Sequence, residues 1–138
     1  MAVEVAYVTD EWLDTIWNNY SKDHLGKLIG LTTNRPLDSI YRDILTHKLQ
    51  LWLVLINKTP VASFTSSIEE YEEGKEVVCE YLGGDRMQEW AATAVAVLEQ
   101  FGKANGCYAL ATVGRKGTER LYKQWGFELE SVRMQRKI

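Results

Sequence analysis

Glu80 and a short C-terminal block contain the residue types best suited to chemistry. Glu80 lies between Cys79 and Tyr81 in an apolar stretch typical of a strand. Partial burial there would raise the pKa of its carboxyl group, and such a carboxylate is suited to act as a general base. A strand carboxylate that faces solvent is the more common arrangement, so both interpretations stay open. Glu76 and Glu69 are the next acidic candidates.

The C-terminal block reads Gly117-Thr118-Glu119-Arg120-Leu121-Tyr122-Lys123-Gln124-Trp125-Gly126-Phe127-Glu128. It predicts a short amphipathic helix over residues 115–125, ended by Gly126, because glycine is favoured just past a helix C-terminus. Tyr122 lies about one helical turn before Gly126. A phenol at this position is either a proton donor or a buried aromatic whose hydroxyl reaches water.

Several other chemistries have no support in the sequence. There is no Gly-x-Ser-x-Gly, no phosphate-binding P-loop and no His-Glu-x-x-His motif. Cys79 and Cys107 form no Cys-x-x-Cys pair and lie near no histidine cluster, so we expect no metal site. Two reduced core thiols in an intracellular, cytoplasmic protein are the expectation. His24 and His47 show no catalytic partner in the sequence.

Charge is distributed unevenly. The chain of 138 residues has a net charge of −3, which favours neither nucleic acid nor an anionic membrane as a partner. Residues 69–89 carry eight acids and two bases, and residues 113–138 carry seven bases and three acids. Two solvated faces explain this pattern, and a two-poled surface for a partner or substrate is the sharper alternative. No apolar run is long enough to span a membrane.

The first half of the chain predicts two helices and a hairpin. Residues 3–9 alternate as a strand, and a helix capped by Thr9 or Asp10 follows. Pro36 is well placed to begin a second helix. Residues 49–56 and 61–68 predict two buried strands joined by a tight turn at residues 57–60.

The second half predicts an acidic loop over residues 69–75 and a strand over residues 76–82, which Gly83-Gly84-Asp85 ends. The clearest helical period of the chain runs from Met87 to Phe101, and Asn105-Gly106 ends that helix. A strand over residues 108–113 precedes the C-terminal helix, and residues 127–138 predict one or two closing strands. The order β-α-α-β-β-β-α-β-α-β predicts a mixed, mostly antiparallel sheet with about four helices on its faces, an α/β (α+β mixed) fold.

This order, together with the C-terminal block, resembles the GNAT superfamily of N-acyltransferases over nearly the whole chain. Leu121, Tyr122, Trp125, Gly126 and Phe127 match the family pattern. The resemblance implies one GNAT-like domain over residues 1–138, with acetyl-CoA held in a wedge between two splayed central strands. It also implies that Tyr122 is the general acid for the departing thiolate and that Glu80 is the general base.

The resemblance places the loop for the CoA pyrophosphate at Arg86-Met87-Gln88-Glu89-Trp90-Ala91. The family motif is Arg/Gln-x-x-Gly-x-Gly/Ala, where glycines let backbone N–H groups at a helix N-terminus reach the phosphates. Met87 and Glu89 stand where glycines are expected, and a carboxylate beside a pyrophosphate is repulsive. The alternative is an ordinary first helical turn. Arg115, and Lys116 beside it, are further candidates for CoA phosphates, although Arg115 stands where asparagine is common.

Three functions remain open at this stage. The first is a degenerate GNAT-fold protein that has lost catalysis and acts as an interaction or structural module, through a protein partner or self-association. By analogy, such proteins are familiar among phage genes, including virion-associated ones. The second is an active N-acetyltransferase that moves an acetyl group to an amine of a small molecule or protein. The third is a sensor that binds CoA or another ligand without chemistry.

Overall fold

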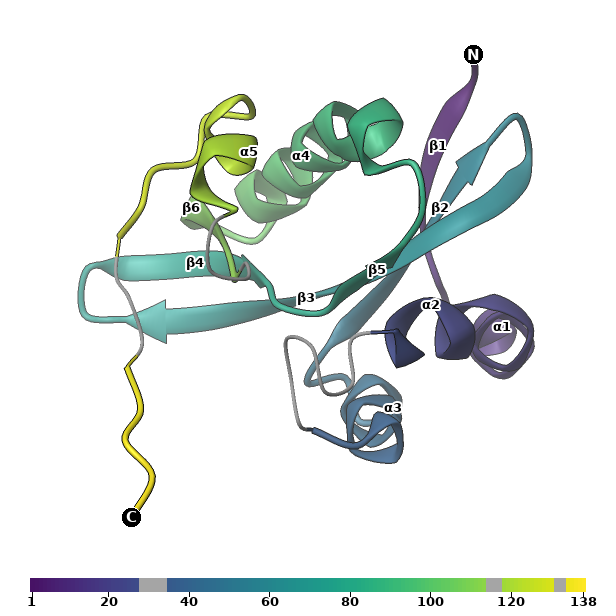
Figure 1. The fold of residues 1–138 in the computed structure, drawn as a ribbon, viewed down its shortest axis with the longest axis horizontal. Helices are drawn as coiled ribbons and strands as arrows, with labels where there is room; N and C mark the ends of the chain where they lie inside the picture. The colour runs from purple at the N-terminus through teal and green to yellow at the C-terminus, as the bar shows by residue number, and fades with distance from the viewer. Residues whose placement is uncertain (28–34, 114–117, 131–133) are drawn as a thin grey trace.

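A computed structural model describes the chain except for residues 28–34, 114–117 and 131–133. It has a mixed α/β fold built on a six-stranded, mostly antiparallel sheet (Figure 1). The sheet contains β1 (Val3–Tyr7), β2 (Gln50–Ile56), β3 (Thr59–Tyr71), β4 (Gly74–Cys79), β5 (Leu82–Gly84) and β6 (Cys107–Thr112). The helices are α1 (Asp10–Ile16), α2 (Lys22–Gly26), α3 (Leu37–Leu45), α4 (Met87–Ala104) and α5 (Glu119–Lys123). A π-helical segment, Trp17–Ser21, joins α1 to α2.

The long strand β3 links the two halves of the sheet. The strands follow the order β1-β2-β3-β4-β6, and β5 also pairs with β3. The first half of β3 pairs with β2 and β5, and the second half pairs with β4. β6 runs parallel to β4, the one parallel pair among the described strands. The predicted hairpin between β2 and β3 is confirmed, with Asn57 and Lys58 at φ 50° and 68°, as a tight hairpin turn requires.

Two hydrophobic cores lie on opposite faces of the sheet, α1–α3 covering one face and α4 the other (Figure 1). We call the first, under α1–α3, the front core; its buried residues are Val8, Leu13, Trp17, Leu25, Ile40, Ile44, Leu49, Leu51, Leu53 and Tyr81. We call the second, under α4, the back core; its buried residues are Trp52, Val54, Ile56, Ala62, Phe64, Val77, Cys79, Trp90, Ala94 and Leu98. The buried residues of these helices therefore face the sheet, whereas Trp12, Tyr20 and Leu45 are exposed.

The predicted strand over residues 76–82 was placed wrongly. The break falls at Glu80 and Tyr81, and Gly83 and Gly84 belong to β5 rather than to a turn. The backbone of α2 crosses β5 so closely that a Cβ on Gly83 would lie 2.1 Å from the His24 carbonyl oxygen. Glycine at this position therefore reflects a close contact between α2 and β5.

Two other predictions at the ends of elements were wrong. The acidic loop is shorter than expected, because β3 continues to Tyr71 and only Glu72 and Glu73 form the turn to β4. Among the described residues after α5 there is no closing strand: residues 127–130 and 134–138 pair with no other strand, and Figure 1 shows the C-terminal end extending away from the sheet. The apolar residues Leu129 and Met134 of this segment are exposed.

Candidate functional site

The parallel strands β4 and β6 separate at their C-terminal ends and form a wedge. Their pairing ends at Cys79 and Thr112, after which the chain from β4 continues along β3 as β5 while β6 leads toward α5. The Cys79 carbonyl accepts a hydrogen bond from the Thr112 hydroxyl at 3.1 Å and one from the Val113 N–H at 3.3 Å. The last carbonyl of β4 is thus already satisfied by β6.

Side chains fill the wedge. A pocket of about 290 Å³ lies between α4, β6 and residues 125–127. The cavity inside the wedge itself has a volume of about 30 Å³, room for about two water molecules. Its lining comes from β3, β4, β5, α4, β6 and α5, and includes Phe64, Cys79, Met87, Trp90, Thr112 and Tyr122. Trp90 is only 1% exposed, stacks on Phe64 with 6.2 Å between ring centroids, and donates its indole N–H to the Asp85 carbonyl at 2.8 Å. This side chain contributes much of the packing.

An ion pair occupies the start of α4. Arg86 precedes the helix in a left-handed conformation, with φ 63°. Its guanidinium binds Glu89, three residues on, through two contacts: Nη2 donates to Oε1 at 2.8 Å, and Nε pairs with Oε2. The Arg86 guanidinium lowers the pKa of the Glu89 carboxyl group, which also lies where the helix dipole favours a negative charge. The predicted loop is therefore a first helical turn with its own anion.

The residues Arg86–Ala91 do not fit a CoA pyrophosphate as their side chains stand. Arg86, the cation of the predicted loop, is committed to Glu89. Met87 and Trp90 line the small cavity, and Ala91, which matches the family's small residue, is buried beneath them. Gln88 is exposed. Arg115 and Lys116, the other candidates for phosphate contacts, lie outside the described residues.

The proposed acid and base do not line one cavity. Tyr122, on α5, lines the wedge cavity, and its ring contacts those of Trp125 and Phe127 edge-on at 5.9 Å each. Glu80 is exposed at the break between β4 and β5, is absent from the cavity lining, and hydrogen-bonds the Tyr81 hydroxyl. Whether either residue takes part in catalysis stays a prediction.

An acidic cluster around Glu76 lies away from the wedge cavity. Glu76 pairs across the strands with Glu69, and both share a face with Tyr71. Burial raises the pKa of Glu76, with further contributions from Glu130 and Glu69. Residues 69–75 were expected to form a loop, and the register that brings Glu76 beside Glu69, like the approach of Glu130, had no signal in the sequence.

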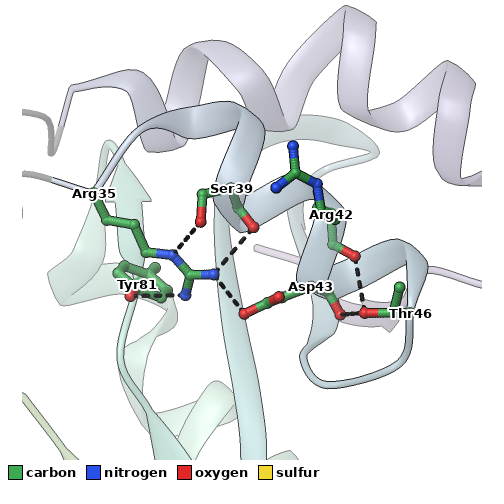
Figure 2. Close-up of polar contacts among 6 residues, drawn as sticks. All are labelled: Arg35, Ser39, Arg42, Asp43, Thr46 and Tyr81. Carbon is green, nitrogen blue, oxygen red and sulfur yellow. Dashed lines mark hydrogen bonds and ion pairs between the residues drawn. The ribbon is translucent and has the colours of Figure 1, made fainter.

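A second polar group, centred on Arg35, was also missed (Figure 2). Arg35 donates to the Tyr81 hydroxyl at 3.3 Å and to Asp43 at 2.5 Å, and it also bonds Ser39. Burial raises the pKa of Tyr81, whereas the Arg35 hydrogen bond lowers the pKa of Asp43. This group ties α3 to the break between β4 and β5. The 46 residues that separate Arg35 from Tyr81 hide the pairing from sequence inspection.

The surroundings of His24 and of the two cysteines fit structural roles for these residues. The Nδ1 atom of His24 lies 2.8 Å from the Ser63 hydroxyl, which in turn lies 2.8 Å from the Ser21 hydroxyl. Cys79 and Cys107 are free thiols, and burial raises the pKa of Cys79 to about 12. The described part of the chain contains no group of three or more acidic, cysteine or histidine side chains arranged for a metal. Among its helices, none is both long enough and apolar enough to cross a membrane.

Comparison with solved structures identifies the fold. Glucosamine-6-phosphate N-acetyltransferase from Arabidopsis thaliana matches with a TM-score of 0.70 and 17% identity, over 99% of each chain. A GNAT family acetyltransferase of Staphylococcus aureus matches with a TM-score of 0.69 and 13% identity, over 100% of each chain. A predicted acetyltransferase with acetyl-CoA from Clostridium acetobutylicum matches with a TM-score of 0.65 and 12% identity, over 99% of this chain and 96% of that chain.

These matches establish that the chain has the fold of the GNAT acetyltransferases, and the resemblance inferred from the sequence is confirmed at the level of fold. No protein-family model matches the chain, and a search of curated proteins finds no matching relative. At these identities the fold is shared, and the activity of the similar proteins does not follow for this chain.

Proposed function

We propose that this protein is a GNAT-fold module that has lost acyl-CoA catalysis and acts through contacts with a partner. The observation that carries the proposal is the Arg86–Glu89 ion pair at the start of α4. In this pairing the helix N-terminus holds its own carboxylate, and a pyrophosphate would have to displace it against like-charge repulsion. Trp90, packed in the wedge below, supports the same conclusion.

Calorimetric titration with acetyl-CoA, and separately with CoA, tests the proposal. We expect no binding at millimolar ligand, because both the anion site and the wedge are occupied by side chains. Micromolar binding to the wild-type protein would overturn the proposal.

Two matched variants separate charge from packing. Glu89→Gln removes the competing carboxylate and should strengthen CoA binding, whereas Glu99→Gln, on the exposed surface of the same helix, should not. Equal behaviour of the two variants would show that the Glu89 charge is not the obstacle. The phage association suggested by analogy stays a prediction.

An N-acetyltransferase is the second candidate, and the position of Tyr122 favours it. This side chain lines the cavity where β4 and β6 separate, as the family resemblance led us to expect of an acid for the departing thiolate. An acceptor amine would be attracted by Glu69, Glu76 and Glu130, and Glu80 or Glu76 would take its proton.

An acceptor screen that follows consumption of acetyl-CoA tests this second candidate. Glucosamine 6-phosphate is the first acceptor to try, since the enzyme from Arabidopsis thaliana is named for it. If turnover is found, Tyr122→Phe should lower the rate while the fold, followed by circular dichroism, stays unchanged. An unchanged rate in this variant would remove Tyr122 from the mechanism.

A further inference from the structure

The pocket between α4, β6 and residues 125–127 lies beside the wedge (Figure 1). Its volume of about 290 Å³ is close to the lower limit for small-molecule sites in proteins. Leu98 and Leu110 belong to its apolar lining, and Tyr108, Trp125 and Phe127 add three aromatic residues. Both the size and the lining therefore suit a small ligand that carries a ring.

The aromatic wall of this pocket is fixed by the end of α5. Gly126 adopts a left-handed conformation, with φ 88°, and its N–H donates to the Lys123 carbonyl at 3.0 Å. The Phe127 N–H donates to the Tyr122 carbonyl at 3.3 Å, a bond typical of a helix C-terminus. The rings of Trp125 and Phe127 also contact the Tyr122 ring edge-on. The wall is thus formed before any ligand binds, which lowers the entropic cost of binding.

Two opposite charges also line the pocket. Glu99 and Lys103 lie one turn apart on α4, and both are exposed. Glutamate and lysine at this spacing often pair on a helix, yet neither residue takes part in an ion pair within the described part of the chain. An acid and a base that stand together without binding each other can bind the two charges of a zwitterion.

We propose that this pocket binds a free amino acid with an aromatic side chain. The α-ammonium group pairs with Glu99 and the α-carboxylate with Lys103, through charge-assisted hydrogen bonds. The ring packs against Trp125 and Phe127, since aromatic pairs favour edge-on and offset contacts. A ligand with one charge would leave the other charged residue unused, and a ligand without a ring would leave the aromatic wall in water.

The pocket is distinct from the expected CoA loop. Glu99 follows Glu89 by about three helical turns on α4, about 15 Å along the helix axis. Trp125 and Phe127 line both the pocket and the wedge cavity, so a bound amino acid contacts the wall on which Tyr122 packs and stays outside the wedge. The inference does not rest on the proposed loss of catalysis, which is tested separately by titration with CoA.

Cys107 provides a reporter for occupation of the pocket. This half-buried thiol lines the pocket, whereas Cys79 is buried, and burial raises the pKa of Cys79 to about 12. Because the thiolate is the reactive form, iodoacetamide at about pH 8 should alkylate Cys107 first. Intact-mass spectrometry follows the reaction over time. Cys107→Ala should remove the fast phase, which identifies the thiol that reacts.

Protection of Cys107 by L-tryptophan measures binding. L-Tryptophan at about 10 mM should slow the alkylation about tenfold, as a dissociation constant on the order of 1 mM implies. Unchanged alkylation would overturn the proposal. Four analogues test the ligand class: indole-3-propionate lacks the ammonium group, tryptamine the carboxylate, indole both charges and L-alanine the ring. Each should protect far less, and protection by any of them equal to that by L-tryptophan would also overturn the proposal.

Variants of the two charged residues locate the binding. Glu99→Gln and Lys103→Gln should each reduce the protection by L-tryptophan to about twofold or less. The ratio of alkylation rates with and without L-tryptophan is measured for each variant, because this ratio cancels any change in the reactivity of the thiol itself. Glu11→Gln and Lys22→Gln, at exposed positions of the helical segments on the other face of the sheet, are matched controls and should keep full protection. Equal protection in all four variants would place the amino acid elsewhere and would overturn the proposal.

Discussion

The two cores of this molecule are closed in different ways. The front core is sealed by polar and backbone contacts: α2 touches β5 through Gly83, and Arg35 bonds Tyr81 and Asp43. The back core is sealed by aromatic packing, in which Trp52, Phe64 and Trp90 stack in succession with centroids 6.1 and 6.2 Å apart. The cavity of about 30 Å³ that Phe64 and Trp90 line belongs to the back core.

The proposed function links this difference to the wedge, which the family resemblance assigns to acyl-CoA. Trp90 and Met87 line the cavity there. A buried side chain at such a position adds stability because it removes apolar surface from water. The front core is closed instead by polar contacts and by the close approach of α2 to β5.

Trp90→Ala should break the back core and is the change with the largest expected effect. Trp90 is fully buried, stacks on Phe64 and donates to the Asp85 carbonyl. Large-to-small changes of this kind cost about 3–5 kcal/mol of unfolding free energy. Urea denaturation measures the loss. Trp12→Ala, at a side chain that is 56% exposed, is the matched control and should cost under about 0.5 kcal/mol.

The cavity left by Trp90→Ala gives a second readout. An apolar cavity in a packed core stays dry and binds small aromatic molecules. Indole should therefore raise the melting temperature of Trp90→Ala and leave that of the wild-type protein unchanged. No effect of indole on the variant would mean that the back core collapses around the vacancy.

Much of the fold could be predicted from the sequence, because local patterns encode it. The period of Met87 to Phe101 predicted α4, and the dense apolar run after Leu49 predicted β2. The failures fall where a tertiary contact decides. Gly83 looked like a turn residue, yet its small size serves the passage of α2 across β5, which no local pattern reveals.

The candidate site was less predictable for the same reason. The family resemblance placed Arg86 and Glu89 in the expected CoA loop, but did not indicate that the two side chains bind each other. The contact between Arg35 and Tyr81 depends on long-range packing. The expected closing strands after Phe127 are not formed by residues 127–130 and 134–138, which pair with no other strand.

Gly83→Ala tests the front core and has the next largest expected effect. A Cβ at this position would overlap the His24 carbonyl oxygen, so α2 must shift away from β5. Overpacking of this kind costs about 1–3 kcal/mol, measured by urea denaturation. Gly26→Ala is the matched control, because its Cβ would meet only the Leu37 side chain at 3.5 Å, an ordinary contact. Equal losses in the two variants would contradict the close approach of α2 and β5.

The pH dependence of stability tests the contribution of His24 to the front core, and it is the smallest effect that we expect. Burial lowers the pKa of His24, with a further lowering from Lys27, while Asp85 and Asp23 oppose the shift. The neutral imidazole beside Ser63 is therefore favoured in the folded state. Because the pKa is lower in the folded protein than in the unfolded chain, the stability contribution is complete above about pH 6.5 and is lost as the pH falls through the lowered value.

Melting temperatures at about pH 7.5 and about pH 5.5 measure this contribution, on either side of the unfolded-state pKa of histidine. His24→Gln should show a smaller decrease between the two pH values than the wild-type protein. His47→Gln is the control, since His47 is exposed and pairs only at the surface with Asp10. If the melting temperatures of His24→Gln and the wild-type protein fall equally between the two pH values, the burial of His24 does not contribute to the loss of stability at acid pH. The front core would then depend on packing at Gly83 rather than on the charge state of the histidine beside it.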